Sequence, residues 1–190
     1  MSLIENDSVS SAGRAAHDIG LAAIIGGNLF ARVGMHPAVA EIDDPRERGK
    51  VVNAAWRRYG AVNGVALASV IAGWAGARLD EASPAMLSPR ERKLALAKDV
   101  AVGVVAITGV AAAVEGMRFG GMEPEGAVPL TDGDNASSQA TDQERRTKGI
   151  LSSLGACHLA AALALAGINA GLGQANFRRP PARRLLRRRY

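Results

Sequence analysis

The chain of 190 residues contains very little of what disulfide frameworks, metal sites and aromatic-lined pockets are made from. It has one cysteine, Cys157, three histidines and only 4% aromatic residues. A single cysteine excludes a disulfide within the chain. The spacing of the other residues shows no motif of a catalytic centre, a metal site or a nucleotide-binding loop. No metal and no cofactor is therefore expected, and a non-enzymatic protein is favoured over an enzyme.

No cleavable signal peptide is expected from the first residues of this sequence. The first residues are polar, with Glu5 and Asp7, and the only basic residue ahead of the first apolar stretch is Arg14. A secretory signal needs a positively charged region before its apolar core. The first helix is therefore expected to enter a membrane as an uncleaved anchor.

Charged residues are absent from four long stretches, although the mean hydropathy of the whole chain is only +0.05. Such segregation is typical of membrane proteins, because a soluble helix carries charge every few residues. A helix needs about 20 residues to cross the hydrocarbon core, and the two shorter stretches reach that length only with flanking side chains that extend to the interface. A soluble helical bundle with a basic tail is the alternative. The uncharged stretches are residues 19–31, 60–77, 100–114 and 150–172.

Three helix starts are marked by a capping residue that is followed three positions later by glutamate, at Asp44, Ser88 and Thr141. Such a box satisfies backbone N–H groups that the first helical turn leaves unpaired. The pattern predicts helices at 45–79, 89–118 and 142–174, after a first helix at 11–35 that ends before Pro37.

Together these elements predict an all-α fold, a four-helix transmembrane bundle of two helical hairpins whose helices extend beyond the bilayer. Similar short sequences, His17-Asp18-Ile19 and Lys98-Asp99-Val100, open the first and third uncharged stretches, which indicates that the hairpins are internal repeats. Residues 1–177 are predicted to form a single membrane domain with spans at about 13–35, 58–79, 97–117 and 150–174.

The segment 121–141 contains Gly, Pro, Ser, Asn and carboxylates and is predicted to be a flexible loop. Its residues Asp132-Gly133-Asp134-Asn135 are faintly similar to a calcium loop. A solvated acidic loop is favoured instead, because no glutamate completes an EF-hand.

The C-terminal tail, residues 178–190, contains seven arginines and is the most basic segment of the chain. The positive-inside rule places such a segment in the cytoplasm, and four spans return the N-terminus to the same side. We therefore expect a multi-pass protein of the cell membrane whose tail binds anionic lipid headgroups. Nucleic acid is a less favoured partner, because few aromatic residues are interleaved with the arginines. GxxxG spacings such as Gly60–Gly64 also allow a homo-oligomer.

Polar residues in or next to the uncharged stretches are the candidate functional residues. Polar groups that face lipid lose hydrogen bonds at a cost of several kcal/mol, so these side chains are expected to turn inward and satisfy one another. The alternative is that they only fix the helix register or complement helix dipoles. The candidate outer pocket consists of Asn28, Asn63, Glu115 and His158, and the candidate inner cluster consists of His17, Asp18, Lys98 and Asp99.

A Gly26-Gly27-x-x-Phe30 motif, a hairpin ended by Pro37 and a Trp56-Arg57-Arg58-Tyr59 entry into the second helix are typical of small bacterial four-helix membrane proteins. Over residues 19–75 the layout loosely resembles the anthrone-oxygenase-like group. The motifs expected after the third helix and at the start of the fourth are missing, so the resemblance carries over no catalytic residues.

Two functions are therefore compared. The first is a structural, accessory or small-solute-handling component of a bacterial envelope. The second, which the resemblance implies, is a membrane oxidoreductase or oxygenase-like enzyme that uses the outer polar pocket.

Overall fold

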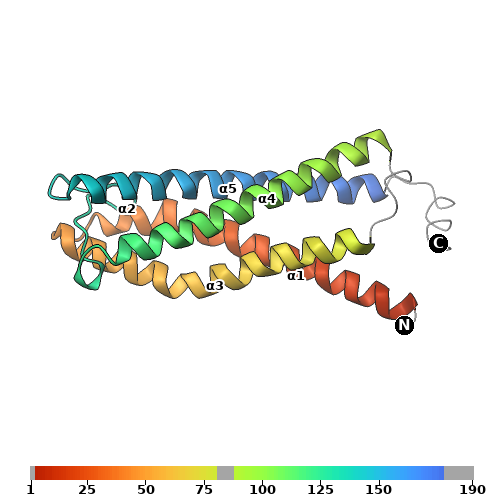
Figure 1. Ribbon diagram of the computed structural model, residues 1–190, viewed down its shortest axis with the longest axis horizontal. Helices are drawn as coiled ribbons and strands as arrows, with labels where there is room; N and C mark the ends of the chain where they lie inside the picture. The colour runs from red at the N-terminus through yellow and green to blue at the C-terminus, as the bar shows by residue number, and fades with distance from the viewer. Residues whose placement is uncertain (1–2, 81–87, 178–190) are drawn as a thin grey trace.

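The computed structural model describes residues 3–80 and 88–177, which form an all-α four-helix bundle, as the sequence predicts (Figure 1). The predicted arginine tail and the connection 81–87 lie outside the described residues. The four long helices run side by side along the long axis. The start of α1 and the end of α5 lie at one end of the bundle, and the loop 121–141 lies at the other.

The helix starts at Pro45, Pro89 and Asp142 are confirmed. Ser88 forms the complete predicted box, because its hydroxyl accepts from the Glu91 N–H and the Glu91 carboxylate accepts from the Ser88 N–H. Thr141 forms the same reciprocal pair with Glu144. Asp44 differs, since it accepts from the N–H of Arg46, one residue earlier than predicted. The long helices are α1 (Leu3–Phe30), α3 (Pro45–Asp80), α4 (Pro89–Gly120) and α5 (Asp142–Phe177).

The predicted end of the first helix before Pro37 is wrong. After α1 the chain continues helically through a π-helical turn, η1 (Ala31–Met35), into a short helix, α2 (His36–Val39). A proline inside an α-helix loses one backbone bond and clashes with the preceding turn. The wider π turn removes this conflict, because Pro37 then lies in the first turn of a new helical segment, where no N–H is needed.

The bundle consists of two hairpins, as predicted, because α1 packs chiefly on α3 and α4 chiefly on α5. Side chains from all four helices meet in one core, in which Ile24, Val70, Val105 and Leu165 are fully buried. Whether the hairpins are repeats of one sequence stays a prediction.

The outside of the bundle carries many large apolar side chains along its middle. Ile107 on α4 is 71% exposed and Val65 on α3 is 69% exposed. Large apolar side chains on a water-facing surface would be unusual in this number. Four helices of the described chain are long and apolar enough to cross a membrane: Ala12–Val39, Pro45–Arg78, Pro89–Gly120 and Asp142–Gln174.

The loop 121–141 is folded into a compact cap over one end of the bundle, which corrects the expectation of a flexible, solvated loop. Val128 and Leu130 are fully buried against Val52 and Phe119. The short 3-10 helix η3 (Pro124–Gly126) starts this packing. The Gly and Pro residues that suggested flexibility form tight turns here, since Gly126 has φ +75° and lies against Asn53.

Candidate functional site

His158 is the most deeply buried of the four predicted outer-pocket residues. Its Nδ1 lies 3.0 Å from the Thr108 hydroxyl, so the pair joins α5 to α4 inside the bundle. Its Nε2 has no hydrogen-bond partner among the described residues. The imidazole is therefore held by one ring nitrogen and keeps the other available for a proton or a small polar group.

Asn28 lies at about the same depth as His158. Asn169 donates to Asp18 over 3.3 Å, and Arg32 donates to the carbonyl of Ser152 over 3.0 Å, and these two bonds fix the antiparallel register of α1 and α5. In that register Asn28 is opposite the turn that carries His158. The buried Asn28 amide nevertheless donates to the carbonyl of Ile24 on its own helix, over 2.9 Å.

The other two predicted pocket residues do not complete the cluster. Glu115 pairs with Arg118 on the same helix over 2.9 Å, near the surface. Asn63 has a buried Oδ1 without a partner in the part of the chain that the structure describes. No hydrogen bond joins any two of the four residues within 3–80 and 88–177. The prediction that they satisfy one another is therefore wrong.

The predicted inner cluster separates into distinct contacts with other residues. His17 is buried, and its Nδ1 lies 2.7 Å from the carbonyl of Val70 on α3, with the charge of Lys98 nearby. Asp18 accepts from Asn169, and Asp99 accepts from Trp74 Nε1 over 2.8 Å.

Asp99 also pairs with Arg78 at the end of α3. It therefore ties α4 to α3, as Asp18 ties α1 to α5. These contacts fit the alternative interpretation, in which polar residues near the helix ends fix how the helices pack. The partners Trp74, Arg78 and Asn169 were missed by sequence reasoning, because each is an isolated residue without a motif.

The cap holds a third polar group, which the sequence analysis did not assemble. His36 Nδ1 lies 3.0 Å from Asp134 Oδ2, and Lys148 Nζ donates to the carbonyl of Gly133 over 2.5 Å. Both His36 and Lys148 are buried, and Lys148 lies over the Phe119 ring at 5.6 Å. These contacts join α2, the loop and α5, so the weak calcium-like sequence 132–135 serves here as a hub of internal contacts.

The carboxylate of Asp132 organises the turn in that sequence. It accepts from the backbone N–H groups of Asp134 and Asn135, over 2.6 Å and 2.8 Å. Burial alone would raise the pKa of Asp132. Hydrogen bonds from Asn135 and from the two N–H groups, together with the charge of Lys148, outweigh burial and lower this pKa below the ordinary value of an aspartate. Asp132 therefore carries its negative charge at neutral pH.

Neither a metal site nor a reactive cysteine site is formed in the part of the chain that the structure describes. No group of three or more His, Cys, Asp or Glu residues lies close enough there to hold a metal ion. Cys157 lies next to His158 in the sequence but is exposed on the outside of α5, whereas His158 points into the bundle. What the interior can do chemically is accept or pass a proton at an imidazole nitrogen.

The chain matches no family model, no curated protein and no solved structure.

Proposed function

We propose that this chain is a four-span integral membrane protein that serves as a structural, accessory or small-solute-handling component of a bacterial envelope. The observation that carries the proposal is the inverted distribution of side chains along the middle of the bundle. Large apolar residues such as Val65 and Ile107 face outward there, whereas the polar His17, Asn28 and His158 face inward.

In water this arrangement would expose apolar surface along the middle of all four helices, whereas lipid tails are as apolar as leucine and cover that surface without cost. The helices are also longer than the bilayer is thick. Since α3 has 36 residues, it is about 54 Å long at about 1.5 Å per residue, against a hydrocarbon core of about 30 Å. For α3 this excess, residues 45–59, is at the cap end of the bundle, outside the lipid.

The proposed topology places both termini in the cytoplasm and the cap on the outer face. It rests on the basic tail, whose Arg178 to Arg189 lie beyond the described residues. Two reporters fused after Tyr190 test it. A fluorescent reporter that folds only in the cytoplasm should be active, and a phosphatase that folds only outside should be inactive. The reverse result would contradict the topology.

Small-solute handling is favoured over a purely structural role by the partnerless Nε2 atoms of His17 and His158. A buried polar atom without a partner costs on the order of 2–7 kcal/mol, and such groups inside membrane bundles commonly mark pathways for protons or polar solutes. Both atoms lack a partner among the described residues.

Proteoliposomes with an internal pH dye test this role under an imposed pH gradient. His158→Asn should abolish a protein-dependent flux while the bundle still folds, and Cys157→Ser on the outer surface should leave the flux unchanged. Equal flux in wild type, His158→Asn and empty liposomes would leave only the structural role. A purified sample that is coloured, or that carries a bound quinone or metal, would instead favour a membrane oxidoreductase.

A further inference from the structure

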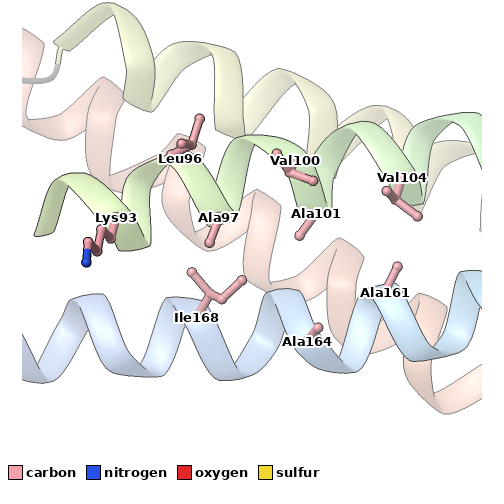
Figure 2. A pocket seen from close by; sticks show the side chains of 9 residues that line it. All are labelled: Lys93, Leu96, Ala97, Val100, Ala101, Val104, Ala161, Ala164 and Ile168. Atoms are coloured by element: carbon pink, nitrogen blue, oxygen red, sulfur yellow. The ribbon is translucent and has the colours of Figure 1, made fainter. Parts of the chain in front are cut away.

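An apolar groove runs along the contact between α4 and α5 on the outside of the bundle (Figure 2). Its volume is about 520 Å³, and it is open to the outside along its length. Leu96, Val100 and Val104 form the α4 side, and alanines with Ile168 form the α5 side. The hollow exists because the small alanine side chains of α5 do not extend as far as Leu96, Val100 and Val104 on α4.

The groove has one charged residue, and that residue lies at one end. Figure 2 shows Lys93 at the start of the row and Val104 and Ala161 at the far end. Every other lining residue is apolar, and Leu96 and Val100 are 65% and 60% exposed. Lys93 is exposed and makes no hydrogen bond or ion pair with any residue of 3–80 or 88–177. The groove therefore combines a long apolar floor with one available cation.

The length of the groove and its position along the bundle match one leaflet of a bilayer. From Lys93 to Val104 the helix rises about 16 Å at about 1.5 Å per residue, which is about half of a 30 Å hydrocarbon core. A methyl group of Leu94 lies 4.0 Å from the position of a Cβ at Gly171, which sets Lys93 level with the end of the uncharged stretch 150–172. Lys93 thus lies at the membrane interface, and the apolar floor extends from there toward the bilayer centre.

We propose that this groove binds an anionic phospholipid of the inner leaflet, with one acyl chain along the apolar floor and the phosphate at Lys93. The inference rests on the proposed membrane location. The negative charge of the headgroup complements Lys93 and the exposed Arg92 next to it. A zwitterionic lipid of the same chain length would fill the floor equally well but would gain less at the cation.

A second groove lies on the same pair of helices, nearer the proposed outer face, and also has one charged residue at one end. It has a volume of about 570 Å³, extends from Arg146 to Cys157 on α5, and includes Thr108 of α4. Its one charged lining residue, Arg146, again lies at the end away from the bilayer centre. The first and last α5 positions of this groove, Arg146 and Cys157, are eleven positions apart, as Lys93 and Val104 are in the first groove. The repeated plan favours a lipid as occupant, because each leaflet supplies a headgroup at its own interface.

Mass spectrometry of the intact chain in mild detergent tests the proposal. The probes are phosphatidylglycerol and phosphatidylcholine with identical acyl chains, titrated separately onto the protein. Wild type should bind phosphatidylglycerol more tightly. Lys93→Gln should lower this preference about five-fold, the equivalent of about 1 kcal/mol for one basic residue at the membrane surface, and should leave phosphatidylcholine binding unchanged. Arg14→Gln removes an exposed charge from α1, at the same end of the bundle but outside the groove, and should change neither lipid.

Filling the groove provides the second arm of the test. Ala164→Phe should lower the binding of both lipids together, and Ala97→Leu, a smaller change on the opposite wall, should do the same if the first variant fails to fold. An unchanged headgroup preference in Lys93→Gln, or unchanged binding of both lipids in the filled variants, would overturn the proposal. A chain that stays soluble without detergent would instead overturn the membrane location on which it rests.

Discussion

The loop cap at one end of this bundle and the middle of its four helices bury opposite kinds of side chain. In the cap, Val128 and Leu130 are fully buried, and the half-buried Arg48 at the start of α3 donates to loop carbonyls such as Thr131 O over 2.8 Å. In the middle, Ile107 is largely exposed and His158 is buried with one ring nitrogen partnerless among the described residues. This difference indicates that water surrounds the cap and lipid surrounds the middle. Apolar side chains are buried where the surroundings are water, and polar side chains are buried where the surroundings are apolar.

The largest effect is expected from a matched pair of leucine truncations. Leu130→Ala removes a fully buried cap side chain and should destabilise the protein by about 2–5 kcal/mol. Leu163→Ala removes a 48% exposed side chain from α5, where lipid or detergent replaces it, and should cost far less. Thermal unfolding in detergent measures both. Equal losses of Tm would show that the middle is packed like the cap.

A pair of lysine substitutions, one in the middle of the bundle and one at the cap end, should distinguish a lipid-facing position from a water-facing one. Ile107→Lys places a charge near the centre of the predicted span 97–117, where insertion scales give a cost of about 2.5–3.5 kcal/mol. Val51→Lys places the same charge on an exposed position of the cap end of α3, where surface substitutions usually change stability by about 0.5 kcal/mol or less. The fraction of chain recovered in the membrane pellet is the measurement. An unchanged pellet fraction for Ile107→Lys would place α4 in water.

Close backbone approach should limit substitution within one hairpin. A Cβ on Gly20 would lie 2.5 Å from the carbonyl oxygen of Ala66 on α3, so Gly20→Ala should destabilise the bundle by about 1–3 kcal/mol. Gly60→Ala is the control, because a Cβ there meets nothing within 4 Å and alanine favours a helix by up to about 1 kcal/mol. Opposite signs of the Tm shift are expected, and shifts of the same sign would mean that α1 and α3 pack differently.

The smallest effect is expected from the hydrogen bond between helices. Thr108→Val removes the partner of His158 and should cost about 0.6 kcal/mol, the average for such bonds in membrane bundles. Ser69→Ala removes a hydroxyl that bonds only to Val65 on its own helix and should cost less. The two unfolding midpoints can be compared in one detergent. A larger loss for Ser69→Ala would show that the Thr108–His158 contact is not a tie between α4 and α5.

The helices were predictable because their signals are local. Ser88 and Glu91 lie three positions apart and meet in one turn, so the sequence alone locates that start. Pro37 misled the prediction, since the π turn that accommodates it has no sequence signature. The cap was missed for another reason. Val128 and Leu130 are two apolar residues in a polar segment, and only their packing on α3 and α4 makes them core.

The polar residues were predictable as buried but not as partners. Depth follows from position along a helix, so Asn28 and His158 were placed at the same level. Partner choice depends on rotation about the helix axes, which is set by long-range packing of Ala and Gly faces without distinct patterns. The structure therefore has Thr108 beside His158, where Asn63 was predicted. It also has Lys148 bonded to the loop cap, for which the sequence contains no motif.

The single cysteine gives the most direct test of the membrane location. Cys157 is exposed on α5 within the uncharged stretch 150–172, so a soluble bundle would offer it to any thiol reagent. Lipid that covers this side chain keeps it out of reach of a reagent that stays in water. The control is Ser138→Cys in a Cys157→Ser background, at an exposed position of the cap.

A membrane-impermeant maleimide is added to intact cells whose outer face is accessible, and to membranes of both orientations. The account predicts labelling at position 138 and none at Cys157 until the membrane is dissolved and the protein unfolded. Labelling of Cys157 in intact membranes as fast as at position 138 would contradict the central claim that the middle of the bundle lies in lipid.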